Sequence, residues 1–259
     1  MSPGHRRVRH LRHAREAWLI TLVLVGGGAA GEEPAVHWGY QGAQGPAHWG
    51  ELEAGYGDCK LGKHQSPVDI RHAKPAALRP IEFSYQVSPL RIIDTGHSVQ
   101  VNIPPGSFIT VGGHRYDLVQ LHFHRPSETR VNGKTFALEA HLVHHDADGK
   151  LAVVAVLLTG GKSNAFLAEL WKHLPAEKGQ ELAPESVTVD PAGLLPPSRA
   201  YYTFTGSLTT PPCSEEVTWF VLTTPVTLLN SEVAAFAAKY PHNARPVQPL
   251  NGRVVEASK

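Results

Sequence analysis

The sequence lacks an excess of either charge. Its 24 lysines and arginines nearly balance 23 aspartates and glutamates, and the formal net charge at pH 7 is +1. Proteins that bind nucleic acid or an anionic membrane surface usually carry a clustered basic excess. We therefore expect no nucleic-acid partner and no membrane-surface partner.

The chain also lacks internal repeats, blocks of like charge and any linker-like change in composition. A chain of 259 residues can form one large domain or two small ones, and the missing linker favours one. Its apolar content of 42% is ordinary for a globular protein. The 24 glycines and 21 prolines favour many turns over long helices.

Cysteine is scarce as well, with only Cys59 and Cys213 in the chain. In an oxidising compartment two cysteines indicate one disulfide, and two buried free thiols are the alternative. The two cysteines do not have the short spacing of paired metal ligands, which argues against a thiolate metal site.

The N-terminus has the three parts of a secretory signal peptide. Five arginines within residues 1–16 precede an apolar run over residues 17–25, and small residues follow over 26–30. The apolar run is short for a bilayer span, although a retained membrane anchor is the alternative. We predict a signal peptide over 1–30, one domain over 31–259 and a periplasmic or secreted protein with no stable membrane span after cleavage.

Short apolar runs bounded by turn signals indicate β-strands along most of the chain. Pairs typical of hairpin turns lie between several runs, at Gly112-Gly113, Asn132-Gly133 and Asp148-Gly149. The expected strands are residues 81–85, 91–94, 98–103, 107–111, 115–124, 135–144, 151–159, 201–206 and 216–223. The pattern predicts a mainly β protein, with a large central, mostly antiparallel twisted sheet joined largely by hairpins and a few short peripheral helices.

Two helices are predicted where capping residues precede a helical stretch. Ser163-Asn164 can cap a helix that runs towards His173, and Asn230-Ser231 can cap one over residues 232–239. The glycine- and proline-rich ends of the mature chain are expected to be irregular. At the N-terminal end, over residues 31–65, we expect a wrap anchored by Trp38 and Trp49.

One stretch, Gln120-Leu-His-Phe-His124, combines imidazoles with strand-like alternation. Successive side chains of a strand point to opposite faces, so Gln120, His122 and His124 share one face. Glu139 and His141 repeat the same offset in a second strand. If the two strands are neighbours, three imidazoles converge, which is the ligand set of a catalytic zinc site with one open position. A polar partner two residues before a histidine fits the acceptor that a metal-bound imidazole needs.

A simpler interpretation of the histidine pattern stays open on these residues alone. The chain contains 16 histidines, so a His-x-His pair can also arise from surface residues or from a hydrogen-bonded core network. The coincidence of two histidines that each follow a polar residue on the same face is the more specific signal.

Motifs along nearly the whole mature chain resemble those of an α-class carbonic anhydrase of the exported bacterial type. They occur in order from about residue 37 to residue 253. The motifs are His37-Trp-Gly-Tyr40, Gln65-Ser-Pro-Val-Asp-Ile70, Gln120-Leu-His-Phe-His124, Ser127-Glu128, Glu139-Ala-His-Leu-Val143, Gly206-Ser-Leu-Thr-Thr-Pro-Pro-Cys213, Val217-Thr-Trp219 and Arg245-Pro-Val-Gln-Pro-Leu250.

The resemblance implies a zinc enzyme that reversibly hydrates carbon dioxide to bicarbonate and a proton, by attack of a zinc-held hydroxide. It implies that Zn²⁺ is held by His122, His124 and His141. Gln120 and Glu139 then support the first and last of these histidines. The backbone carbonyl of Asn243 supports the middle one.

The resemblance also assigns groups that handle protons. Thr209 would accept a hydrogen bond from the hydroxide and donate one to Glu128, and His97 would carry protons to solvent because an imidazole titrates near neutrality. Waters between zinc and His97 would be ordered by Tyr40, Thr95 and Gln100. On its own, the stretch Thr209-Thr210-Pro-Pro is more typical of a plain turn, and a lone histidine beside a turn is usually just exposed.

The remaining positions that match the family form the substrate pocket and a disulfide. The substrate pocket comprises Val143, Val153, Leu208, Thr210, Val217 and Trp219, of which Thr210 would contact bicarbonate. Cys59 and Cys213 match the disulfide of exported members. Two departures, Thr129 where the family usually has histidine and Phe204 where tyrosine is common, are expected to alter local hydrogen bonding without loss of activity. A homodimer is compatible with the resemblance.

Two other functions are compatible with parts of the sequence. His122-x-His124-x-x-x-Glu128 has the spacing of a cupin-type metalloenzyme, although the glycines that flank that motif are absent and Glu128 would have to be a ligand. A non-catalytic periplasmic zinc-binding module is the second. Its weakness is that the three histidines, Glu128, Thr209 and His97 occur together.

Overall fold

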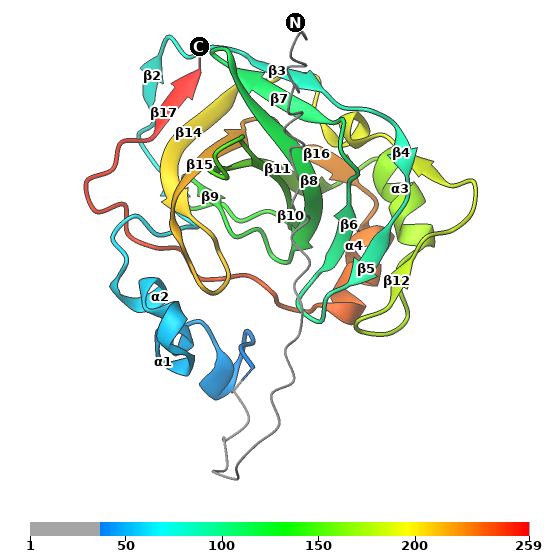
Figure 1. The fold of residues 1–259 in the computed structure, drawn as a ribbon, viewed down its shortest axis with the longest axis horizontal. Helices are drawn as coiled ribbons and strands as arrows, with labels where there is room; N and C mark the ends of the chain where they lie inside the picture. The colour runs from blue at the N-terminus through cyan, green and yellow to red at the C-terminus, as the bar shows by residue number, and fades with distance from the viewer. Residues whose placement is uncertain (1–36, 259) are drawn as a thin grey trace, which may run out of the picture. The chain divides into compact units, whose positions relative to one another are not determined.

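A thirteen-stranded sheet dominates the computed structural model, which describes residues 37–258 (Figure 1). Two short strand pairs lie apart from it, β1 (Asp69–Ile70) with β9 (Arg130–Val131) and β4 (Ser88–Pro89) with β13 (Thr188–Val189). The main path of the large sheet runs β12 (Glu181–Leu182), β5 (Ile92–Asp94), β6 (Val99–Asn102), β8 (His114–His124), β10 (Leu138–His145), β11 (Leu151–Gly160), β15 (Glu215–Leu222), β14 (Tyr201–Ser207), β17 (Glu256–Ser258) and β2 (Lys74–Ala76).

Three more strands attach to the middle of this path. β3 (Ile81–Ser84) pairs with β7 (Phe108–Val111), β7 pairs with the first part of β8, and β16 (Val226–Leu228) pairs with β11. The mainly β fold predicted from the sequence is confirmed, with strand ends shifted by a few residues.

The sheet is mixed, although most of its pairs are antiparallel. β11 lies parallel to β15 and to β16, and β17 lies parallel to β2. Parallel neighbours need long crossover connections, and the chain between β11 and β15 supplies one that contains a helix and strand β14. The apolar pattern of a strand does not show which strand lies beside it. The predicted sheet, joined largely by hairpins, therefore did not include these parallel pairs.

Two helices cover the sheet, and only one of them has the predicted cap. α3 (Ala165–Lys172) is capped by Asn164, whose side chain accepts the Leu167 N–H at 3.0 Å. The cap predicted for α4 (Asn230–Lys239) was wrong, because the helix already begins at Asn230. Instead, the carboxylate of Glu232 accepts the N–H of Leu229 at 2.7 Å, which satisfies a free donor of the first turn.

The N-terminal segment is more regular than predicted. It contains two one-turn α-helices, α1 (Trp49–Leu52) and α2 (Asp58–Leu61), and two 3₁₀ turns, Gly42–Gln44 and Ala54–Tyr56. A further 3₁₀ turn, Pro191–Leu194, lies later in the chain. Trp49 is fully buried, as expected of an anchor, whereas Trp38 is half-buried. Within residues 37–258 no helix has the length and apolarity needed to cross a bilayer, and the predicted signal peptide lies outside this range.

The two faces of β8 have different surroundings. Phe123, on one face, is buried and contacts Trp171 of α3 and Phe236 of α4 edge-on, with ring centroids 5.1 and 6.2 Å apart. The opposite face carries His122 and His124. Burial of the apolar face therefore fixes the direction in which the two imidazoles point.

The predicted disulfide between Cys59 and Cys213 is present and spans 154 residues of sequence. It joins α2 of the N-terminal segment to the loop between β14 and β15, which also carries Thr209 and Thr210. The alternative of two free thiols is thereby excluded.

Candidate metal centre

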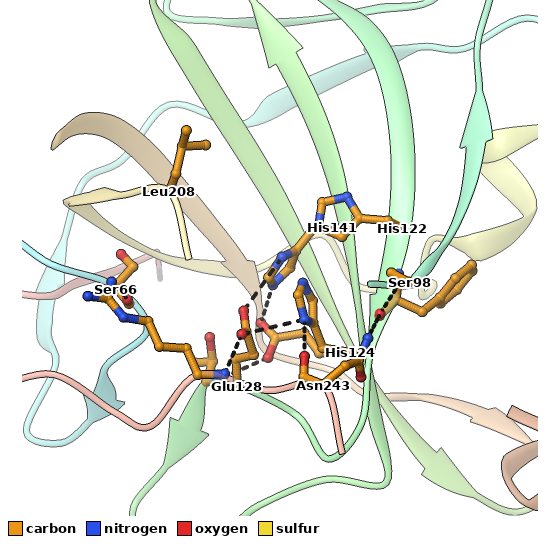
Figure 2. A network of polar contacts seen from close by, with 12 residues as sticks. Ser66, Ser98, His122, His124, Glu128, His141, Leu208 and Asn243 are labelled. Atoms are coloured by element: carbon orange, nitrogen blue, oxygen red, sulfur yellow. Dashed lines mark hydrogen bonds and ion pairs between the residues drawn. The ribbon is translucent and has the colours of Figure 1, made fainter. Parts of the chain in front are cut away.

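Three imidazoles meet at the centre of the sheet. β8 and β10 are antiparallel, with His122 opposite His141 and His124 opposite Glu139. One nitrogen from each of the three histidines lies within 4.8 Å of the others. Figure 2 shows the three rings grouped above Glu128 and Asn243.

Hydrogen bonds set the tautomers of the two histidines on β8. The Nδ1 of His122 lies 2.8 Å from Gln120 Oε1, and the Nδ1 of His124 lies 2.8 Å from the carbonyl oxygen of Asn243. Both acceptors require a proton on Nδ1 and leave the lone pair of Nε2 free. The Nε2 of His124 is buried and has no partner among the described residues, as expected of an atom that awaits a metal ion.

The third imidazole is supported by a carboxylate. Glu139 Oε1 lies 3.1 Å from His141 Nε2, in contact but not aligned as a hydrogen bond, and Glu139 Oε2 accepts the Thr129 N–H at 2.7 Å. The carboxylate occupies the Nε2 side of the ring, so Nδ1 is the ligand atom that remains. The donor set of three nitrogens fits a zinc ion.

The electrostatics of the cluster favour the ligating form of each ring. Burial lowers the pKa of His122 and of His141 well below the usual value for histidine, and the neighbouring His124 adds to both shifts. Burial also lowers the pKa of His124, against the opposing effect of the Asn243 carbonyl. All three rings are therefore neutral at pH 7, which is the state that binds metal.

Glu128 lies beneath the histidines and is almost fully buried. Its Oε1 accepts the backbone N–H of Arg245 at 2.8 Å and lies 3.4 Å from His124 Nδ1. Burial raises the pKa of Glu128 well above its usual value, while the Arg245 N–H and the hydroxyl of buried Thr209 oppose that rise.

Arg245 was not among the predicted site residues. Its guanidinium is buried and donates to Gln65 Oε1 and to the Ser66 carbonyl, both at 2.8 Å, and to the Cys59 carbonyl at 3.1 Å. Arg245 therefore ties the Glu128 side of the centre to the N-terminal segment. The motif around Arg245 was a family signal, but nothing in it indicated a contact through the backbone.

An apolar row leads away from the cluster across three strands. Val143 of β10 lies opposite Val153 of β11, and Val153 lies beside Trp219 of β15. The rings of Trp219 and His141 meet edge-on, 5.0 Å apart. Val217 is buried in the same apolar cluster and half-buried Leu208 packs against it.

The remaining substrate-pocket residue and the two departures lie around this row. Thr210 is half-buried, and its carbonyl accepts the Cys213 N–H at 2.9 Å. Thr129 is buried and supports Glu139 through its backbone, which does not depend on the residue type. Phe204 stacks parallel to Trp219, with centroids 6.1 Å apart.

His97 lies in the turn between β5 and β6. Its ring stacks on Trp38, with centroids 3.6 Å apart and planes 9° apart, and its Nε2 lies 2.9 Å from Nε2 of His37. Burial, His37 and Lys178 together lower the pKa of His97 to about 4. This differs from the near-neutral titration expected of a shuttle, and no sequence signal indicated the pairing with His37.

The three predicted water-ordering residues have different surroundings. Burial raises the pKa of Tyr40 well above its usual value, and the charge of Glu128 adds to the rise. Gln100 lies opposite His122 on β6, and its Nε2 donates to Asn102 Oδ1 at 2.7 Å. Thr95 is exposed, and its hydroxyl accepts the Ser98 N–H at 3.0 Å within the turn.

A sheet that brings three neutral imidazoles to one point, each with an oxygen acceptor beside its other nitrogen, defines a three-histidine metal-site protein. The chain belongs to the α-carbonic anhydrase family, since the family model described as eukaryotic-type carbonic anhydrase matches residues 44–259.

Relatives and solved structures agree with this assignment. A carbonic anhydrase of Pectobacterium carotovorum is 43% identical over 239 residues, which cover 91% of this chain and 97% of that protein. One of Neisseria gonorrhoeae is 41% identical over 239 residues, covering 92% and 94%. The α-carbonic anhydrase of Thermovibrio ammonificans, solved with the inhibitor sulfanilamide, has a TM-score of 0.82 at 43% identity and covers 86% of this chain and 99% of its own. Dioscorin complexed with ascorbate has a TM-score of 0.79 at 32% identity, covering 85% and 97%.

Proposed function

We propose that the protein catalyses the zinc-dependent reversible hydration of carbon dioxide to bicarbonate and a proton. The observation that carries the proposal is the convergence of His122, His124 and His141, with His124 Nε2 buried and unpartnered among the described residues. Family membership and the carbonic anhydrases named above support the same reaction.

The three histidines would hold Zn²⁺, with Gln120, Glu139 and the Asn243 carbonyl as their oxygen partners. A zinc ion held there lowers the pKa of coordinated water and so supplies a nucleophile near neutral pH. The chain's part is to keep the three rings neutral and fixed in orientation. The lowered pKa of each ring and the bonds at Nδ1 of His122 and His124 support this.

Glu128 and Thr209 would orient the reacting water. This role needs Glu128 in its ionised form. Burial raises the pKa of Glu128, and the positive charge of a zinc ion held by the histidines would oppose that rise. Because an ionised carboxylate can only accept, a Thr209 hydroxyl that donates to Glu128 keeps its lone pairs for one donor on the reacting side. The Arg245 N–H holds Glu128 in place at 2.8 Å for this role.

The apolar row would hold the substrate. Carbon dioxide has neither net charge nor dipole, so Val143, Val153, Leu208, Val217 and Trp219 can bind it without desolvating a polar group. Thr210, half-buried in the loop between β14 and β15, would contact bicarbonate.

His97 would move the proton to solvent through waters ordered by Tyr40, Thr95 and Gln100. A ring that accepts a proton and then releases it needs access to a proton acceptor in solution. The contact of His97 with exposed His37 supports such an exit for the proton.

Two rival functions are weighed against this proposal. A cupin-like site would use Glu128 as a ligand, but among the described residues the group of converging ligand atoms consists of the three histidines and does not extend to Glu128. A non-catalytic zinc-binding module would need the three histidines but not Glu128, Thr209 and His97, all of which are present in this chain.

Metal analysis combined with a carbon dioxide hydration assay separates the three functions. One zinc per chain with fast hydration supports the proposal. Iron without hydration favours the cupin-like enzyme, and zinc without hydration favours the binding module.

The disulfide also supports a proposal for the cellular location of the protein. The Cys59–Cys213 disulfide favours an oxidising compartment, which supports a signal peptide over residues 1–30 and a periplasmic or secreted location of the domain over 31–259. A homodimer is compatible with this setting.

A further inference from the structure

The loop between β14 and β15 carries Thr209, and we call its residues 208–214 the Thr209 loop. Gln65, which belongs to the N-terminal segment, is buried beside this loop. Its amide Nε2 donates to the Cys213 carbonyl at 3.0 Å and to Glu215 Oε1 at 3.0 Å. The Thr209 loop is therefore attached near its end to a side chain that lies far away in the sequence.

The oxygen of the same amide is bonded to the residue that holds Glu128. Gln65 Oε1 accepts a hydrogen bond from Arg245 Nη1 at 2.8 Å. The backbone N–H of Arg245 donates in turn to Glu128 Oε1 at 2.8 Å. A continuous series of hydrogen bonds thus runs from Glu128 through Arg245 and Gln65 to the Thr209 loop.

The partners of Gln65 require an amide at this position. A guanidinium can only donate, so it needs the amide oxygen, whereas a carbonyl and a carboxylate can only accept, so they need the amide nitrogen. A carboxylate in place of the amide would deprive the Cys213 carbonyl of this donor. An apolar side chain would leave Arg245 Nη1 with the Ser66 carbonyl as its acceptor.

Close packing fixes the position of Gln65. A Cβ added at Gly62 would overlap Gln65 Nε2, so the chain passes directly against the amide. The backbone carbonyl of Gln65 also accepts from Arg253 Nη2 at 2.7 Å. A group that is held on several sides transmits its position to its partners, which is what a residue that orients a reacting group must do.

The residue after Gln65 holds the other end of the same loop. Ser66 and Ser207 are both buried and exchange two hydrogen bonds. The Ser66 N–H donates to Ser207 Oγ at 2.8 Å, and the Ser207 N–H donates to Ser66 Oγ at 3.1 Å. Because Ser207 directly precedes the Thr209 loop, Gln65 and Ser66 together hold the loop at both ends.

We propose that Gln65 is a positioning residue that sets how the Thr209 hydroxyl meets Glu128. It does so by joining the Thr209 loop to Arg245, the residue that holds the Glu128 carboxyl. This inference rests on the proposed hydration of carbon dioxide, in which Thr209 and Glu128 orient the reacting water. The effect of Gln65 on the reaction is therefore exerted through Thr209, while the three histidines keep their metal.

Hydrogen exchange measured by mass spectrometry tests the position of the loop without an assay of activity. The Leu208 N–H donates to the Ser214 carbonyl at 3.0 Å, so its exchange reports opening of the Thr209 loop. In Gln65→Leu we expect exchange in the loop to rise by about fivefold or more, with a much smaller change in β8 and β10. Unchanged exchange in the loop, or an equal rise in β8 and β10, would overturn the proposal.

Hydration kinetics test whether this position matters for the reaction. The kcat/KM of zinc-loaded Gln65→Leu should fall by about tenfold or more with one zinc per chain retained, because a small misplacement of an orienting group slows the reaction strongly. Gln86→Leu makes the same change at an exposed glutamine and should keep the parent kcat/KM. Equal kcat/KM in Gln65→Leu and the parent chain would overturn the proposal.

A double-mutant cycle separates positioning from a general structural role. If Gln65 acts through Thr209, its loss matters little once the Thr209 hydroxyl is gone. Adding Gln65→Leu to Thr209→Ala should therefore change kcat/KM by no more than about twofold. If the two single losses multiply in the double variant, Gln65 acts independently of Thr209, and the proposal is overturned.

Gln65→Glu provides the same test if Gln65→Leu does not fold. The carboxylate still accepts from Arg245 but cannot donate to the Cys213 carbonyl, so exchange in the Thr209 loop should rise and kcat/KM should fall. Parent values of both quantities would overturn the proposal. If the zinc-loaded parent chain does not hydrate carbon dioxide, the proposed function fails, and the exchange data alone decide whether Gln65 fixes the Thr209 loop.

Discussion

The three histidines of the metal centre and the pair formed by His37 and His97 are held in different ways. His122 and His141 face each other on paired strands and have oxygen partners beside their outer nitrogens. His37 and His97 come from the N-terminal segment and a turn, and they contact each other and Trp38. Strand pairing thus fixes the positions of the proposed ligands, whereas the turn leaves the proposed proton-transfer group dependent on its surroundings.

Removing a ligand from the strand-borne set should have the largest effect. His124→Ala deletes the buried Nε2 that has no other partner among the described residues, so zinc affinity should fall by more than the roughly 10- to 100-fold typical of partners outside the ligand set. Metal analysis after dialysis measures the change, with His97→Ala as the control that keeps one zinc per chain. If His124→Ala kept one zinc per chain, as His97→Ala is expected to do, His124 would not be a zinc ligand.

Removing the Cys59–Cys213 disulfide, which joins the N-terminal segment to the loop of Thr209, should have the second-largest effect. The disulfide links α2, near the His97 side, to the loop of Thr209 across 154 residues. The double variant Cys59→Ser/Cys213→Ser should lose about 2 to 5 kcal/mol of unfolding free energy, because its unfolded chain is no longer constrained. Urea denaturation measures the loss, and reductant should lower the stability of the parent chain but not of the variant. An unchanged midpoint would show that the link contributes nothing.

A further histidine, His144, sharpens the comparison because it is buried but belongs neither to the metal centre nor to the His37–His97 pair. Its Nε2 lies 2.9 Å from the hydroxyl of Tyr85, and burial lowers its pKa to about 4. The unfolded chain binds a proton at His144 below about pH 6.5, and the folded chain does so only below about pH 4. Stability should therefore be full above pH 6.5 and fall by up to about 3 kcal/mol as the pH drops to 4.

His144→Phe should flatten this pH dependence, whatever its effect on stability at neutral pH. Denaturation curves of both chains between pH 4 and pH 7 give the comparison. The same slope in both would mean that other groups cause the acid sensitivity.

The smallest predicted effect concerns the loop-borne site. His97→Ala should lower turnover in weak buffer by up to roughly 100-fold and leave zinc in place, because only proton transfer is slowed. Added imidazole should restore much of the loss. Turnover that is independent of buffer in both chains would exclude His97 from proton transfer.

The same difference between strands and loops decides how much of each region can be predicted from the sequence. Alternation along residues 120–124 and 139–141 is enough to predict that the histidines of each strand share a face with their polar partners, because side chains in strands repeat every second residue. The register of β8 and β10, which turns two pairs into one cluster, could only be assumed. The family resemblance supplied the remaining residues.

Contacts made through the backbone could not be predicted from the residues alone. The Asn243 carbonyl, the Thr129 N–H and the Arg245 N–H are groups that every residue type other than proline offers, so they leave no pattern. The contacts of His97 with His37 and Trp38 were equally unpredictable, because these residues lie about 60 positions apart in the sequence and contact each other only in the folded chain. The wrong cap for α4 had a similar origin, because Glu232 satisfies the Leu229 N–H from inside the helix.

X-ray absorption spectroscopy of the purified zinc protein tests the central claim most directly, because it counts the atoms that surround the metal. We predict one zinc per chain with three imidazole nitrogens, at about 2.0 to 2.1 Å, and one oxygen from solvent. A protein carboxylate among the ligands, a sulfur ligand or fewer than three imidazoles would contradict the assignment of His122, His124 and His141.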